Sequence, residues 1–266
     1  MITEPVRDPA LSLALIRSLL QRSGPDRTEV VRLTDEEVAL LAGPDADELA
    51  PLPWLSTVPP EHRETALAVA ARNLVVRGMA LASPPQDGTG DVSVAVPEDV
   101  HAVLAARRAA STVVIAGRRA AGAPSTHILY VQGDDGVVEE HVTSGGLHMF
   151  TTGTLEAAIA ALVAFVDPDG AAAHDGTAVE IELADVAMGS VEAGPLGESR
   201  YVTVVSVVSL SPGAEPAERR LSVYALPERV EVSEPRSDRP ALAVCPVGPR
   251  SLHAALEKVI RGEGAR

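Results

Sequence analysis

The segment from Thr126 to Val166 constrains the fold more than any other part of the chain, because it predicts three strands and a helix in succession. The runs Ile128 to Val131 and Val137 to Val142 flank Gly133-Asp134-Asp135-Gly136, a sequence typical of a turn, so they predict an antiparallel hairpin. A Gly-rich turn leads into a third short strand, and Thr154 then caps a helix whose apolar residues recur at helical spacing. We therefore expect an α+β fold with a central antiparallel sheet and flanking helices.

Turn and capping signals place the other elements. They predict helices over residues 9–23, 35–41, 60–77, 97–110 and 249–261, and strands over 29–33, 111–117, 178–184, 201–210, 221–226, 230–232 and 241–245. The helix over 35–41 has the strongest signal, because Thr34 and Glu37 have the spacing of a capping box. The single tryptophan, Trp54, is expected to be held in a groove between elements.

The end of the chain resembles its middle. In both places a short strand passes through a glycine, Gly153 or Gly248, into a helix with apolar residues at matching positions. Such a match also arises by chance, so two pseudo-symmetric halves are one possibility and a fold without duplication is the other. We divide the chain into a helix-rich N-terminal part, 1–110, and a part with strand meanders that each precede a helix, 111–266; one single domain is the alternative.

The charge excludes several classes of partner. The chain has 37 acidic and 22 basic residues and a net charge of −15, whereas nucleic acids and anionic membranes require a basic face. Only one cysteine, Cys245, is present, so there is no intramolecular disulfide. No signal peptide or membrane-spanning segment is evident, and we expect a cytoplasmic protein.

No catalytic constellation, cofactor motif or complete metal-ligand set is recognisable, so we predict no enzyme, no cofactor and no metal site. Among possible ligands, His127, His141 and His148 fall on neighbouring predicted strands. A two-residue turn at 134–135 would point His127 and His141 to opposite sides, whereas a three-residue loop would place both on one side. We expect ordinary hydrogen-bonded or surface histidines. Glu139 and Glu140 are adjacent, so they should face opposite sides of their strand rather than act together.

The order of these elements resembles the EspG family, the cytosolic chaperones of actinobacterial type VII (ESX) secretion. The similar features are the segment Val31 to Leu41 with its Leu33, Thr34, Glu37 and Leu40, a helix ending at Arg77-Gly78, a helix start at Val96-Pro97-Glu98, and a closing strand, Gly/Pro loop and Leu-x-x-x-Leu helix. The longer tryptophan-bearing C-terminal pattern of the family is missing. The resemblance implies an α+β fold with pseudo-two-fold halves and recognition of a helical secretion substrate through an apolar surface.

The strand over 201–210 is the candidate for this surface, because both of its faces are apolar and it must be covered on both. We expect Tyr201, Thr203, Val205 and Val207 to bind a protein partner, with ordinary core packing as the alternative. The chain itself would be a monomer or a homodimer. Two other functions stay open. One is an enzyme with a pocket near Thr143 to His148, and the other is a winged-helix regulator with a ligand-binding α+β domain, although residues 1–110 carry 10 basic and 16 acidic residues.

Overall fold

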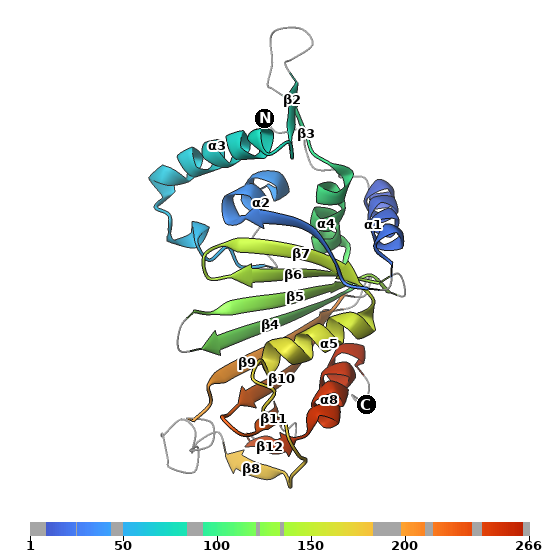
Figure 1. The fold of residues 1–266 in the computed structure, drawn as a ribbon, viewed down its shortest axis with the longest axis vertical. Helices are drawn as coiled ribbons and strands as arrows, with labels where there is room; N and C mark the ends of the chain where they lie inside the picture. Colours follow the sequence, from blue (N-terminus) through green and yellow to red (C-terminus); the bar gives the residue numbers. More distant parts are fainter. Residues whose placement is uncertain are drawn as a thin grey trace. The chain divides into compact units, whose positions relative to one another are not determined.

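A computed structural model describes residues 9–24, 26–43, 50–83, 93–120, 123–133, 136–182, 198–210, 215–235 and 241–262 (Figure 1). The chain forms two compact units. Unit 1 comprises Met1–Ser111 and Tyr130–Thr154, and unit 2 comprises Thr112–Leu129 and Leu155–Arg266. Unit 1 combines nearly all of the predicted N-terminal part with the segment 130–154 of the predicted second part. The division at 110/111 suggested by the sequence stays a prediction.

The elements form an α+β fold, as predicted. The helices are α1 (Pro9–Ser23), α2 (Asp35–Ala42), the 3₁₀ turn η1 (Leu55–Thr57), α3 (Pro60–Val76), α4 (Glu98–Ala109), α5 (Leu155–Val166) and α8 (Pro249–Arg261). The strands are β1 (Thr28–Thr34), β2 (Leu81–Ser83), β3 (Ser93–Ala95), β4 (Thr112–Ala120), β5 (Ser125–Val131), β6 (Val137–Thr143), β7 (Leu147–Gly153), β8 (Val179–Glu182), β9 (Tyr201–Ser209), β10 (Ala217–Ala225), β11 (Val230–Pro235) and β12 (Ala241–Val247).

Ten of the strands have the order β1-β7-β6-β5-β4-β9-β10-β11-β12-β8, and the pairs whose register is described are antiparallel. Strands β2 and β3 form a separate antiparallel pair. The chain order repeats: β4 to β7 precede α5, and β9 to β12 precede α8. This repetition supports the duplication suggested by the two strand-glycine-helix segments.

In unit 1, α1 packs on α4 and β7, and α2 packs on β1 and α3. The capping box that starts α2 is formed as predicted, because the Glu37 amide donates to the Thr34 hydroxyl and the Thr34 amide donates to the Glu37 carboxylate. The prediction for Trp54 was wrong, since 40% of this residue is exposed. The contact that fixes this residue involves its backbone, because the Trp54 amide donates a hydrogen bond to the Asp35 carboxylate.

In unit 2, α5 and α8 pack against each other, α5 packs on β9, and α8 packs on β10 and β12. Aliphatic side chains fill the layer between helices and strands, and the largest fully buried ones include Ile159, Leu162, Leu221, Leu252 and Leu256. Each such side chain contributes roughly 1.5–3 kcal/mol by leaving water. Among the described residues, no helix has the length and apolarity needed to cross a membrane.

Candidate protein-binding face

Strand β9 separates its residues into two faces with different environments. Thr203, Val205 and Val207 are fully buried, whereas Val204 on the opposite face is 43% exposed. Alternate residues of a strand point to opposite sides, and the helices that pack on this part of unit 2 cover only one of them. The expectation that β9 must be covered on both faces was wrong. We call the residues on the other side, Val202, Val204, Ser206 and Val208, together with their cross-strand neighbours on β4 and β10, the open face. Val204 is exposed and the other three are half-buried, and at the Val208 end the neighbouring Val113 is only 1% exposed.

The structure therefore places three of the four predicted binding residues, Thr203, Val205 and Val207, in the core of unit 2. The fourth, Tyr201, is half-buried at the start of β9. Its ring lies 5.3 Å from the guanidinium carbon of Arg118, which also stacks at 4.4 Å over the ring of Phe165. Partner binding by these four residues stays a prediction.

The register of β4, β9 and β10 defines the open face. Val204 lies between Gly117 on β4 and Ser222 on β10, two small neighbours that leave its side chain prominent. A methyl group added at Gly117 would meet no atom within 4 Å, so the space beside Val204 is open. One pair along, Ser206 lies between Ile115 and Arg220.

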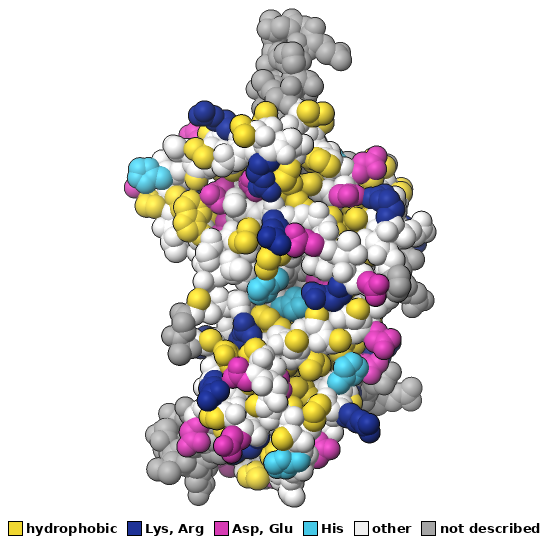
Figure 2. Space-filling model, in the orientation of Figure 1, with side chains coloured by type: hydrophobic (Ala, Val, Ile, Leu, Met, Phe, Trp, Pro, Cys, Tyr) yellow, Lys and Arg dark blue, Asp and Glu magenta, His cyan; other side chains and the backbone are white. Residues whose placement is uncertain are grey.

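The rim of the open face is charged. Val202 is flanked by the exposed Arg119 and the half-buried Tyr224, and Val208 has the exposed Glu218 beside it. An apolar centre with a polar rim is the usual anatomy of a protein–protein interface. Figure 2 is drawn from the other side, on which α5 and α8 lie in front of the strands, and shows basic, acidic and apolar side chains intermixed there.

Unit 1 contains a buried network of charged side chains that the sequence did not reveal. His148 on β7 lies between two carboxylates, with Nδ1 2.5 Å from Glu140 and Nε2 2.7 Å from Asp35. The Tyr130 hydroxyl donates to Glu140 at 2.6 Å, and Arg107 Nε lies 3.2 Å from the same carboxylate. All five residues are at most 5% exposed.

The geometry fixes the charges of this network. An imidazole with an ionised carboxylate beside each nitrogen donates to both in its protonated form, which this geometry favours for His148. Burial by itself lowers the pKa of His148, but the hydrogen bonds and charges of Asp35 and Glu140 outweigh it and raise the pKa above its ordinary value. Burial raises the pKa of Glu140, yet Arg107, His148 and Tyr130 outweigh it and lower the pKa. Two cations and two anions thus neutralise each other.

The network also holds the segment that carries Trp54. The second oxygen of Asp35 accepts hydrogen bonds from the Trp54 amide at 2.7 Å and the Leu55 amide at 2.8 Å. The β6–β7 turn presses against the same place, because a methyl group at Gly146 would lie 2.8 Å from both Asp35 Cγ and Trp54 Cβ. His148, Asp35 and the Trp54 backbone therefore form one structural anchor.

The predicted separation of Glu139 and Glu140 is consistent with their partners. Glu139 forms an ion pair with Arg27 at 2.8 Å, whereas Glu140 contacts Arg107 and His148. His148 has both ring nitrogens engaged, and His127 in unit 2 packs its ring edge against Phe165. The alternative turn lengths at 134–135 concern positions outside the described residues. No group of three or more His, Cys, Asp or Glu residues with metal-binding geometry occurs in the described segments.

The sequence matches no protein-family model, and no curated protein matches it significantly. Solved structures do match. The type VII secretion system chaperone EspG5 of Mycobacterium tuberculosis, solved in complex with a PE25–PPE41 dimer, superposes with a TM-score of 0.55 over 87% of this chain and 95% of that chain, at 17% sequence identity. The resemblance is one of fold. It confirms the EspG-like architecture that the order of elements suggested.

Proposed function

We propose that this chain is a cytoplasmic, non-enzymatic chaperone or adaptor for type VII secretion substrates, and that it binds a helical partner through the open face. The observation that supports the proposal most is the EspG5-like fold over 87% of the chain. EspG5 was solved in complex with a PE25–PPE41 dimer, which supports a protein partner for this chain.

The chemistry of the open face suits the apolar tip of a helical hairpin. Val202, Val204 and Val208 offer branched aliphatic side chains, and the open space above Gly117 leaves room for an apolar group of the partner. Association would remove Val204, now 43% exposed, from water. Arg119, Glu218 and Arg220 on the rim would set the orientation of the partner more than its affinity.

A matched pair of substitutions on adjacent residues of β9 tests this proposal. Val204→Asp puts a carboxylate on the open face and should leave unit 2 folded, whereas Val205→Asp buries an unpaired carboxylate in the core and should give insoluble protein. Purified wild type and Val204→Asp, each checked by circular dichroism, are used to capture proteins from the cytosol of the source organism. Mass spectrometry then identifies what each one retains.

We expect the wild type to retain a PE/PPE-type helical substrate and Val204→Asp to bind it at least about tenfold more weakly. Capture of the same substrate at equal strength by folded Val204→Asp would contradict the proposed face. Absence of any PE/PPE-type protein from the wild-type sample would contradict the proposed function itself.

A further inference from the structure

Helix α3 has an outward face that no described residue of unit 1 buries. Of its 17 residues only Ala70 and Leu74 are buried, because the helix contacts the rest of the unit mainly through α2. The opposite side is apolar: Val69 is 49% exposed and Val76 is 85% exposed. A helix that is polar on its solvent side needs no partner, whereas this one has a second apolar stripe.

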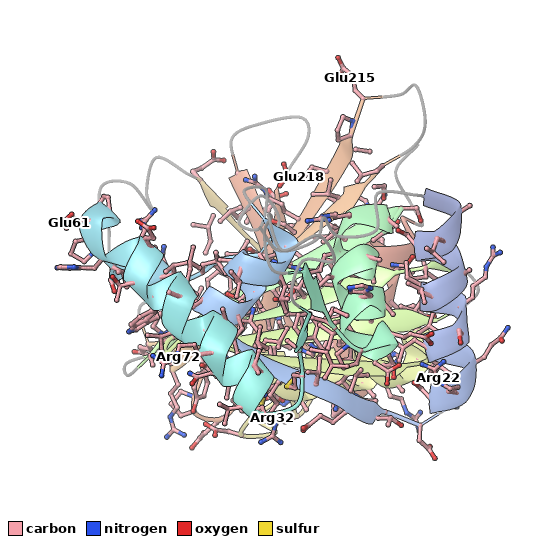
Figure 3. All side chains as sticks on the ribbon, turned by 90° about the horizontal axis from the view of Figure 1, so that it is seen from above. Arg22, Arg32, Glu61, Arg72, Glu215 and Glu218 are labelled. Atoms are coloured by element: carbon pink, nitrogen blue, oxygen red, sulfur yellow. The ribbon has the colours of Figure 1, made fainter. Side chains whose placement is uncertain are left out.

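The outward stripe is bounded by one acidic and one basic residue. At 100° per residue, Glu61, Thr65, Ala68, Val69, Arg72, Val75 and Val76 share the side opposite Ala70 and Leu74. Glu61 and Arg72 are eleven positions apart, which is about three turns, so they point in nearly the same direction roughly 16 Å apart. Figure 3 labels Glu61 near the start of α3 and Arg72 farther along the same helix. Neither makes an ion pair with any residue in the described segments.

We propose that α3 is a self-association surface, at which two copies of this chain pair their α3 helices antiparallel about a two-fold axis between positions 66 and 67. In that arrangement Glu61 of each copy lies level with Arg72 of the other, which gives two ion pairs by symmetry. Thr65 and Ala68 meet at the centre, where their small side chains let the helix axes approach to about 8–10 Å.

The charges of Glu61 and Arg72 favour a second copy of this chain as the partner, and they favour the antiparallel orientation. A parallel pairing of the two helices would place Glu61 beside Glu61 and Arg72 beside Arg72, which is repulsive at both ends. The antiparallel pairing turns both contacts into attractions and places Thr65, Ala68 and Val69 between the two helices, whereas Val75 and Val76 extend past the first residue of the other copy's helix. A single helix from each copy buries less than the roughly 1,200–2,000 Å² of a stable complex, so the dimer is weak and forms at high protein concentration.

Charge reversal and charge exchange test the proposal. Sedimentation velocity of the purified chain is measured from about 1 μM to 1 mM, the range of Kd expected for a small interface. The wild type should shift from monomer to dimer within it. Glu61→Arg opposes Arg72 of the other copy at both symmetric positions and should weaken association at least about tenfold. The double variant Glu61→Arg/Arg72→Glu restores both ion pairs and should dimerise like the wild type. Glu215→Arg makes the same charge change in unit 2 and should have no effect.

A wild type that stays monomeric up to 1 mM would overturn the proposal, as would a dimer that Glu61→Arg leaves unchanged. A double variant as weak as Glu61→Arg would also overturn it, because the residues would then not face each other. Circular dichroism of each variant excludes misfolding as the cause. The measurement uses the purified chain alone, so its result is independent of the proposed secretion substrate.

Discussion

Replacement of His148 by alanine tests the buried network of unit 1 most directly. The substitution leaves Asp35 and Glu140 buried, with Arg107 beside Glu140 as the remaining cation that the described residues supply to the network, and it removes both hydrogen bonds of 2.5 and 2.7 Å. Removal of one partner from a buried charge pair costs about 3–5 kcal/mol. With a urea dependence of roughly 2 kcal/mol/M, the midpoint of unfolding should fall by about 1.5–2.5 M.

The chain provides its own probe for this measurement. Trp54 is the only tryptophan, and Asp35, a partner of His148, holds its backbone. Urea unfolding followed by tryptophan fluorescence therefore reports on the network itself. His62→Ala, an exposed position on α3, is the control and should change the free energy of unfolding by no more than about 0.5 kcal/mol.

A second substitution separates loss of charge balance from loss of packing. In the His148→Ala background, Glu140→Gln removes one of the unbalanced carboxylates, so the double variant should be less destabilised than the sum of the two single variants. A change below about 1 kcal/mol for His148→Ala, or strict additivity of the two substitutions, would refute the view that His148 neutralises these carboxylates.

Three further predictions concern the pH dependence of the network, the β6–β7 turn and the end of α8. The pKa of His148 is raised above 6.5, so its stabilisation should be complete below pH 6.5 and lost as the pH rises through the folded-state value. The pKa of Glu140 is lowered below 4.5, so its contribution to the free energy of unfolding should be present above pH 4.5 and lost as the pH falls through the folded-state pKa. The urea midpoint measured as a function of pH tests both the His148 and the Glu140 prediction. Gly146→Ala requires a side chain at φ +74° and a contact of 2.8 Å with Asp35, and should lower the free energy of unfolding by about 2–3 kcal/mol with a shift of tryptophan emission; an unchanged midpoint would contradict the close contact. Arg219→Ala removes two hydrogen bonds to the last carbonyls of α8, so we expect a loss of about 1–2 kcal/mol and faster amide exchange in the final turn of α8, whereas unchanged exchange there would show that the cap is dispensable.

Local signals were sufficient for most of the secondary structure. The Thr34–Glu37 capping box formed as predicted, and the predicted bounds of the last helix, 249–261, agree with α8. Such signals involve residues within a few positions of each other, so the sequence displays them directly. Strands β4 and β10 are longer than the predicted 111–117 and 221–226, because pairing along β9 continues through the arginines at positions 118, 119, 219 and 220.

The buried network could not be found in this way. His148 and Asp35 are 113 positions apart, and neither belongs to a motif. A histidine on a strand and an acidic residue in the first turn of a helix each have an ordinary local explanation, and only packing of α2 against the β6–β7 turn joins them. One local signal was present on β6. Glu140 shares a face of the strand with Val138 and Val142, so its carboxylate points to the same side as these two apolar residues.

By itself, the sequence determined the α+β class, the element order and the resemblance to the EspG chaperones, because periodicity, caps and turns act over short distances. Only the tertiary structure decided which side of β9 is available. Both sides are apolar in sequence, so the choice depended on where α5 and α8 pack, and they bury Val205 while Val204 remains in contact with water. Long-range packing likewise turned four separate charged residues into one neutral cluster, and in the described part of unit 1 it left Val69 and Val76 on the outward stripe of α3 exposed.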